Sequence, residues 1–98
     1  MDIGRFIWGE RKRAANLCKH DVDFAIVERF IFDTAVITID DRKNYGEVRY
    51  RAFGVIDDRL HVLIFTARGA QTRVISQRQA NDRESENYAE TPEDQIDS

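Results

Sequence analysis

The sequence contains little that could cross-link or interrupt the chain: one cysteine, one proline and five glycines in 98 residues. A disulfide needs two cysteines, so Cys18 alone excludes an internal disulfide framework and fits a protein of the reducing cytosol. One cysteine and two histidines are too few for a structural zinc site built from four such ligands.

Long apolar runs are also lacking. No segment approaches the roughly 18 consecutive apolar residues of a membrane span. Residues 1–10 include Asp2, Arg5 and Glu10 and do not have the apolar segment of a secretory signal. We therefore expect a cytoplasmic protein with no membrane partner. The hydrophobic share of 42% suffices for one modest core, and the length of 98 residues allows one domain.

Positive and negative charges are separated along the chain. Residues 82–98 hold seven acidic residues and one arginine, a net charge of −6, whereas residues 1–81 carry +3. Only three of the fifteen basic residues are lysines, and arginine offers a rigid fork of donors that suits phosphates. A basic body fits a phosphate-bearing partner. The same pattern equally fits a solvated surface that ends in an acidic, disordered segment.

Apolar spacing predicts an amphipathic helix near the N-terminal end. In residues 9–20, Ala14, Leu17 and Cys18 occupy positions i, i+3 and i+4, which lie on one face of a helix. We expect this apolar stripe to be the buried face. Cys18 then acts as a small core residue.

Two further helices are predicted from their caps. Asp23 is a candidate N-cap for a helix over residues 24–31. Asn81 and Glu84 have the spacing of a capping box, which predicts a short helix over residues 82–89.

From residue 35 the apolar period changes to two, which is typical of strands. Turn residues at Asp57-Asp58 and Gly69-Ala70 separate neighbouring strands. The sequence therefore predicts an α+β domain over residues 1–89, ordered ααββββα, with two N-terminal helices, a four-stranded antiparallel sheet and a short C-terminal helix. We expect residues 90–98 to be an acidic, disordered tail. The predicted strands are residues 35–40, 47–55, 60–67 and 72–78.

Two-residue turns fix the pairing of the last three strands and sort their side chains onto two faces. One face is apolar, with His61 opposite Arg78 at its edge, and collects Tyr50, Ala52, Leu63, Phe65, Val74 and Ser76. The other face has an apolar half and an arginine-rich half, and collects Phe53, Val62, Ile64, Ile75, Arg49, Arg51, Arg73, Glu47 and Arg68.

Clustered arginines on one sheet face have two interpretations. In the functional one, they bind a polyanion and stabilise a pentacoordinate phosphorus while Glu47 accepts a proton. In the structural one, their stems cover apolar side chains and their charges pair with Glu47 and with aspartates at the rim. His20, at the end of a helix, is more often a capping residue than a catalytic one.

Several spaced motifs resemble the BrnT family of toxins and cover about residues 6–88. The sequence departs from the usual family pattern at Gly9, Asp21 and Thr34. The matching positions are Phe6-x-Trp8, Lys12, Asn16, Lys19-His20-x-Val22-x-Phe24, Phe32-Asp33, Asp41-Arg42, Tyr45-Gly46-Glu47-x-Arg49, Gly54, Arg68-Gly69, Arg73-Val74-Ile75-Ser76-x-Arg78-x-Ala80, Glu84 and Tyr88.

This resemblance implies a RelE-like fold and an endoribonuclease toxin of a type II toxin–antitoxin system, which cleaves RNA without a metal or other cofactor and inhibits translation. It also implies a ribbon-helix-helix antitoxin, BrnA, in a complex of two toxins and two antitoxins that contacts operator DNA only through the antitoxin. Attack by the 2′-hydroxyl of RNA is the implied reaction.

The resemblance also suggests roles for individual residues. Arg68, Arg73 and Arg78 are candidate phosphate and transition-state ligands, and Glu47 is the candidate base. Possible RNA contacts are Arg49, Tyr45, Lys12 and His20. Two other functions stay open: a degenerate toxin that only binds its antitoxin in operon control, and a generic RNA-binding domain.

Overall fold

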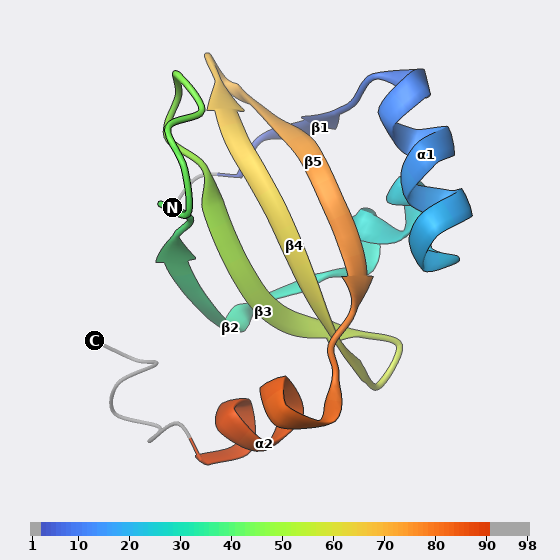
Figure 1. Cartoon of the computed structure of the whole chain (residues 1–98), viewed down its shortest axis with the longest axis vertical. Coiled ribbons are helices and arrows are strands. Elements are labelled where there is room, and N and C mark those ends of the chain that lie inside the picture. Colours follow the sequence, from blue (N-terminus) through green and yellow to red (C-terminus); the bar gives the residue numbers. More distant parts are fainter. Residues whose placement is uncertain (1–2, 91–98) are drawn as a thin grey trace.

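A five-stranded mixed sheet forms the centre of the protein (Figure 1). The computed structural model describes residues 3–90. Among the described strands the order across the sheet is β1-β5-β4-β3-β2, and β1 alone pairs in parallel. The elements in chain order are β1 (Arg5–Ile7), α1 (Glu10–His20), the 3₁₀ helix η1 (Phe24–Arg29), β2 (Ile31–Ile39), β3 (Tyr50–Ile56), β4 (Arg59–Arg68), β5 (Gln71–Gln79) and α2 (Asp82–Glu90).

The expected RelE-like order ααββββα is wrong in two places. A strand, β1, precedes the first helix and pairs with β5. With only three residues, β1 is too short to show an alternating pattern, and it forms because β5 offers it an edge. The expected second helix, residues 24–31, is the 3₁₀ helix η1, which ends at Arg29. Ile31 already begins β2, whose pairing with β3 is irregular between Ile31 and Val36.

Other local predictions are confirmed. Helix α1 begins at Glu10 and ends at His20. Asp57 and Asp58 have φ values of 49° and 68°, as a two-residue hairpin of type I′ requires. The end of the predicted tail, residues 91–98, lies outside the described residues. No helix within residues 3–90 is long and apolar enough to cross a membrane.

A bulge in the β4–β5 pair changes the predicted faces of the sheet. The pairing shifts between Ile64 and Phe65, so that Ser76 lies opposite Ile64 and Arg78 lies opposite Val62. The expected placement of Ser76 on the apolar face, and of Arg78 opposite His61, is therefore wrong. Both side chains join the arginine-bearing face, because one extra residue in a strand moves every following side chain to the other face.

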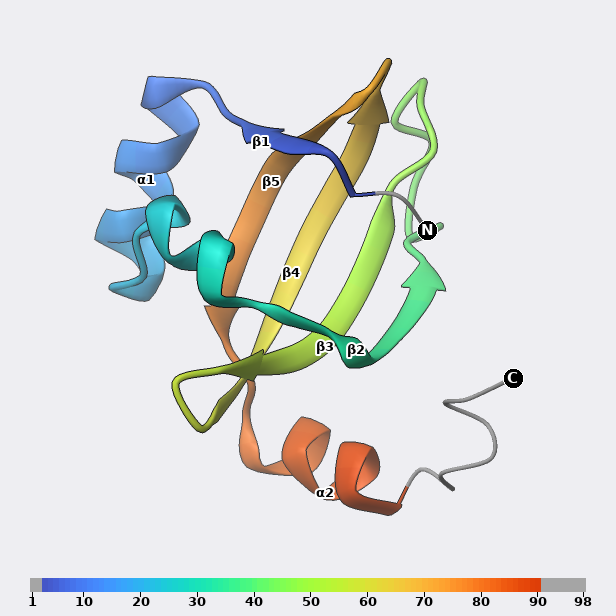
Figure 2. The same cartoon turned by 180° about the vertical axis from the view of Figure 1, so that it is seen from behind.

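The hydrophobic core lies on the opposite face of the sheet, under η1 and the beginning of β2 (Figure 2). Gly54 is required there, because a Cβ at this position would lie 2.4 Å from the Phe30 ring. The other face, onto which the register places Arg51 and Arg78, is turned toward the viewer in Figure 1, with α2 below the end of the sheet. The core residues are Phe24, Val27, Phe30, Ala52, Ile56, Leu63, Phe65 and Val74.

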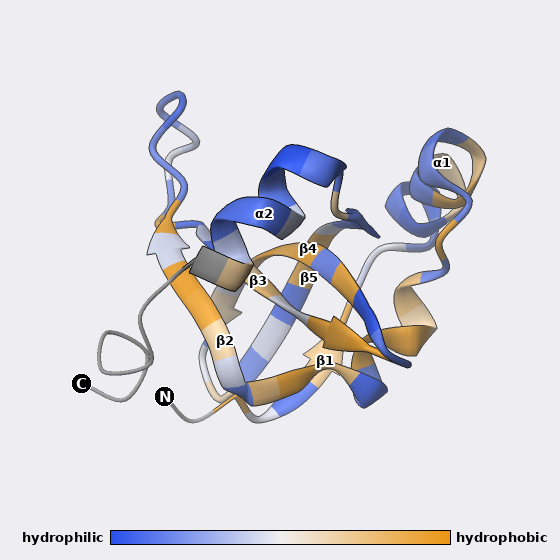
Figure 3. Cartoon of the chain, turned by 90° about the horizontal axis from the view of Figure 1, so that it is seen from below, coloured by the Kyte–Doolittle hydropathy of each residue, from blue (hydrophilic) through white to orange (hydrophobic). Residues whose placement is uncertain are grey.

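Helix α1 lies beside β5 and is mostly hydrophilic (Figure 3). The expectation that Ala14, Leu17 and Cys18 form its buried face is wrong: all three are exposed, Leu17 to 43%. The buried residue is instead Asn16, at 7% exposure. Apolar spacing misleads here because the contact between α1 and β5 is made through a polar side chain.

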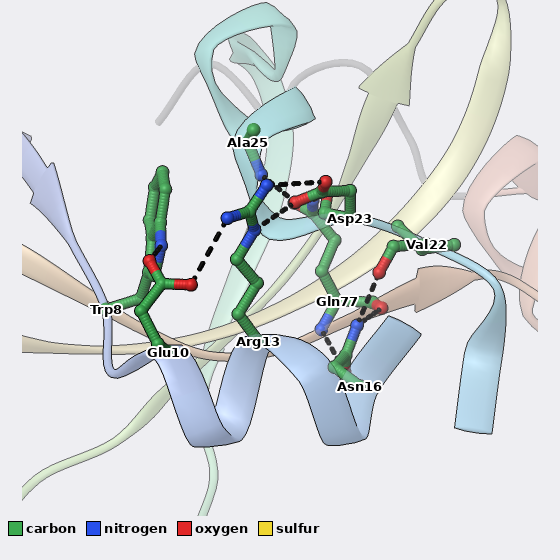
Figure 4. A network of polar contacts seen from close by, with 8 residues as sticks. All are labelled: Trp8, Glu10, Arg13, Asn16, Val22, Asp23, Ala25 and Gln77. Carbon is green, nitrogen blue, oxygen red and sulfur yellow. Dashed lines mark hydrogen bonds and ion pairs between the residues drawn. The ribbon is translucent and has the colours of Figure 1, made fainter. Parts of the chain in front are cut away.

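Asn16 ties α1 to β5 by hydrogen bonds (Figure 4). Its Nδ2 donates to the carbonyl oxygens of Gln77 (2.7 Å) and Val22 (2.9 Å), and its Oδ1 accepts from the Gln77 N–H (3.2 Å). Next to it, Arg13 donates to both carboxylate oxygens of Asp23, at 2.8 and 2.9 Å. Together these contacts set how α1 is rotated against the sheet.

Replacement of Asn16 by alanine should lower the free energy of unfolding by roughly 3 kcal/mol, because buried backbone groups then lose their partners. Leu17→Ala, one position along, should cost less than about 1 kcal/mol, since that side chain is largely in solvent. Urea denaturation of both variants measures the difference. A larger loss for Leu17→Ala would contradict the observed rotation of α1.

Candidate nucleic-acid site

A cavity of about 250 Å³ opens on the arginine-bearing face of the sheet. The end of α1, strands β3 to β5 and the loop after β2 contribute to its wall. Five arginine or lysine side chains line it against one carboxylate, that of Asp40. The lining residues are Lys19, His20, Asp40, Arg42, Tyr45, Arg49, Arg51, Val62, Ile64, Ile75, Ser76 and Arg78.

Two of these arginines are anchored by carboxylates in or near the loop after β2. Arg42 donates to both carboxylate oxygens of Asp40, at 2.7 and 2.9 Å, and Tyr45 donates its hydroxyl proton to the same group at 3.3 Å. The Asp40 side chain is 1% exposed, and the bonds from Arg42 hold its pKa at about 2. Arg49 donates to Glu47 at 3.1 Å. These ion pairs hold the guanidinium groups at the cavity wall.

A third arginine of the cavity, Arg78, is held by a carboxylate of α2. Arg78 donates to both carboxylate oxygens of Glu84 on α2, at 2.7 and 2.8 Å. This contact raises the pKa of Arg78, while the positive charge of Arg42 opposes the rise. Arg42 and Arg78 both line the cavity.

Arg51 differs from the other arginines of the cavity. Its guanidinium carbon lies 5.6 Å from the centre of the Phe53 ring, and its Nε has no solvent exposure and no hydrogen-bond partner in the described part of the chain. A desolvated donor without a partner is costly. An anion in the cavity would relieve that cost. The sequence placed Arg51 on this face but did not single it out as a site residue. Its alternation with Arg49 was the signal that could have identified it.

Tyr45 adds an aromatic surface to the same wall. The guanidinium carbon of Arg49 lies 4.1 Å from the centre of the Tyr45 ring, and the Lys43 ammonium lies 5.5 Å from it. Such cation–π contacts keep positive charge beside an aromatic ring. The arrangement offers a stacking surface next to phosphate-binding groups.

His20 lies in the last turn of α1, at the cavity wall. Burial lowers its pKa below 6.5, and the nearby charges of Lys19 and Arg78 lower it further. The imidazole is therefore neutral at pH 7 and able to accept a proton. A shallower groove continues from the cavity along α1, lined by Lys12, Ala15, Asn16, Lys19, His20, Ile75 and Ser76.

The structure brings some of the predicted site residues together and separates others. Arg78, Arg49, Tyr45 and His20 line the cavity, and Lys12 lines the adjoining groove. Glu47 lies at the edge, between Arg49 and Arg68, which donates to it at 3.0 Å. Both arginines lower the pKa of Glu47.

Arg68 and Arg73 lie farther along the sheet. Arg78 pairs opposite Val62, and Arg68 follows Val62 by six positions in β4. At about 3.3 Å per residue, this separates the two arginines by roughly 20 Å along the strand. They cannot both contact one phosphate. Arg73 lies next to the beginning of α1, with its Nη2 3.1 Å from where a Cβ of Gly9 would be.

Comparison with known proteins identifies one family. Residues 8–84, most of the chain, match the family described as "Ribonuclease toxin, BrnT, of type II toxin-antitoxin system". No curated protein matches the chain significantly.

The imidazole of His20 should titrate below pH 6.5 in an NMR pH series. Arg78→Met and Lys19→Met should each raise that pKa, because each removes a neighbouring positive charge that disfavours the imidazolium. Arg11→Met is the matched control, since Arg11 is exposed and nine residues away on the same helix. An unchanged His20 pKa in Arg78→Met would show that the two groups do not share the cavity.

Proposed function

Since the chain belongs to the BrnT family of ribonuclease toxins of type II toxin–antitoxin systems, we propose that it is an endoribonuclease that binds the scissile phosphate of RNA in this cavity. One observation carries the proposal. Five cationic side chains surround a space of about 250 Å³, and Arg51 among them has a buried Nε without a partner in residues 3–90. This arrangement suits a phosphodiester group, which is small and negatively charged.

The proposed reaction is an internal transfer that needs no water as nucleophile. The 2′-hydroxyl gives its proton to a base in the cavity and its oxygen bonds to the adjacent phosphorus, while the bond from phosphorus to the 5′-oxygen breaks. The products are a 2′,3′-cyclic phosphate and a 5′-hydroxyl, whose oxygen takes up a proton from solvent. Arg51 and Arg78 stabilise the charge that builds up on the non-bridging oxygens. The reaction requires no metal ion.

His20 is a better candidate for the base than Glu47. Its lowered pKa leaves the imidazole neutral, and it lies in the cavity beside Arg78. Glu47 instead accepts hydrogen bonds from Arg49 and Arg68, and the resulting low pKa makes its carboxylate a weak proton acceptor. We assign Glu47 to holding Arg49.

The remaining predicted residues extend the RNA contact on both sides. Lys12 in the groove along α1 would neutralise a neighbouring phosphate, and Arg68 and Arg73 would do the same toward the other end of the sheet. Tyr45 would stack on a base. Cleavage of messenger RNA would inhibit translation.

A type II toxin–antitoxin system also includes an antitoxin. We propose a ribbon-helix-helix protein of the BrnA kind, in a complex of two toxins and two antitoxins that reaches operator DNA through the antitoxin. A partner that covers the cavity with acidic groups would neutralise the toxin, because it would compete with RNA for the same charges.

One observation favours a second function. Three cavity arginines already have carboxylate partners, Asp40, Glu47 and Glu84, as expected if the arginines serve stability alone. The chain would then be a degenerate toxin that binds its antitoxin in operon control without cleaving RNA.

Cleavage of RNA by the purified, antitoxin-free chain in EDTA separates the two functions. We expect 2′,3′-cyclic phosphate ends, and a loss of roughly 100-fold or more in rate for Arg51→Ala, because a preorganised donor to the transition state is removed. Arg59→Ala is the matched control: Arg59 is exposed in the β3–β4 hairpin and does not line the cavity.

Two outcomes would contradict the proposal. Intact RNA with folded wild-type protein would favour the degenerate toxin. Equal losses in Arg51→Ala and Arg59→Ala would place the cleavage outside the cavity.

A further inference from the structure

Polar contacts attach helix α2 to the sheet at several points. The Ala80 N–H donates to the carbonyl oxygen of Leu60 at 2.9 Å, just before the helix begins. The Tyr88 hydroxyl donates to the carbonyl oxygen of Thr34 at 2.8 Å. Between them, Glu84 reaches Arg78 on β5. In Figure 1, α2 lies across the end of the sheet, below the face that carries the arginines.

The Glu84 carboxylate contacts both the N-terminal cap of α2 and Arg78 on β5. Its Oε1 accepts from the Asn81 backbone N–H at 3.0 Å and from Arg78 Nη1 at 2.7 Å, and its Oε2 accepts from Arg78 Nη2 at 2.8 Å. Asn81 Oδ1 accepts in return from the Glu84 N–H at 2.8 Å. The capping box that begins α2 is therefore also the support of an arginine in the cavity.

Arg78 needs such a support. It has a long, flexible side chain, and it lines the cavity together with Arg42, which carries the same charge. A bidentate contact fixes the plane of a guanidinium group as well as its position. The Arg78 and Glu84 side chains are 33% and 20% exposed, so the pair is partly shielded from solvent and its geometry is defined.

The contact with Glu84 also leaves one edge of Arg78 open. The guanidinium group has five N–H donors. Two are given to Glu84, and Nη1 has a further contact with the carbonyl oxygen of Gln79 at 3.3 Å. Within residues 3–90, no other acceptor for Arg78 is found, which leaves the edge with the Nε–H and the second Nη2–H for a phosphate.

We propose that Glu84 is a positioning residue, whose carboxylate holds one edge of Arg78 and thereby presents the other edge to the scissile phosphate. The role rests on the proposed ribonuclease function. It makes the first turn of α2 part of the support of the site. The opposite role for Glu84 is competition, in which its carboxylate occupies the place of the phosphate.

Glu84→Gln and Asn81→Ala separate this role from the stability of α2. Glutamine keeps an oxygen for the Asn81 N–H but loses the charged, two-oxygen contact with Arg78. Asn81→Ala breaks the cap but leaves the pair intact. We expect kcat for RNA cleavage to fall roughly 10-fold to 100-fold in Glu84→Gln, because the phosphate ligand is misplaced. KM should change much less, Asn81→Ala should stay within about threefold, and Glu84→Asp should recover part of the loss.

The position of Arg78 can be followed without any activity. In ¹H–¹⁵N spectra of arginine side chains, we expect resolved Nη–H signals for Arg78 in the wild type and in Asn81→Ala, and averaged signals in Glu84→Gln. If wild-type protein leaves RNA intact, the proposed function fails, and the spectra still decide whether Glu84 holds Arg78. Resolved signals in Glu84→Gln would overturn the positioning role. So would an unchanged kcat in a cleaving enzyme, and faster cleavage by Glu84→Gln would establish competition instead.

Discussion

The repulsion between like charges is the constraint on which the site depends. Five cationic side chains line one cavity, and carboxylates hold three of them, Asp40 at the cavity wall and Glu47 and Glu84 outside it. Asp40 is buried in a loop, Glu47 precedes β3 and Glu84 belongs to α2. Each carboxylate pairs with one arginine of the cavity, and Glu47 pairs with Arg68 as well. Arg51 and Lys19 leave the cavity an excess of positive charge. The same ion pairs thus serve both stability and the proposed binding of an anion.

The arginines of the cavity differ in whether they have a carboxylate partner. The ion pairs with Asp40, Glu47 and Glu84 keep three guanidinium groups preorganised. The buried Nε of Arg51, by contrast, has no hydrogen-bond acceptor within residues 3–90. Beside them, His20 is held neutral by burial and by its cationic neighbours. Family membership names a ribonuclease toxin, and these groups are the ones that we propose to act in RNA cleavage through the 2′-hydroxyl.

The sequence showed the arginine-bearing face but not the site within it. Alternation and the Asp57-Asp58 hairpin sufficed to place Arg51, in β3, and Arg49, just before β3, on one face. The bulge between Ile64 and Phe65 moved Arg78 onto that face, and no local pattern marks a bulge. The capping box at Asn81 and Glu84 could be predicted from its spacing. The contact of Glu84 with Arg78 could not, because it joins α2 to another element, β5.

Burial of polar groups was the other feature that the sequence did not show. Periodicity assigned the buried face of α1 to Leu17, but Asn16 is buried because its amide satisfies both backbone groups of Gln77. Asp40 and Arg42 lie in a loop where no period applies. Both cases depend on partners that are distant in sequence or outside regular structure, and only the folded chain brings them together.

A crystal structure of the chain with an RNA oligonucleotide that carries one 2′-deoxy nucleotide at the cleavage position tests this account most directly. We expect the phosphate following that nucleotide to lie within hydrogen-bond distance of Arg51 and Arg78, with the His20 ring beside the 2′ carbon. A phosphate bound instead at Arg68 or Arg73, with an empty arginine cavity, would contradict it.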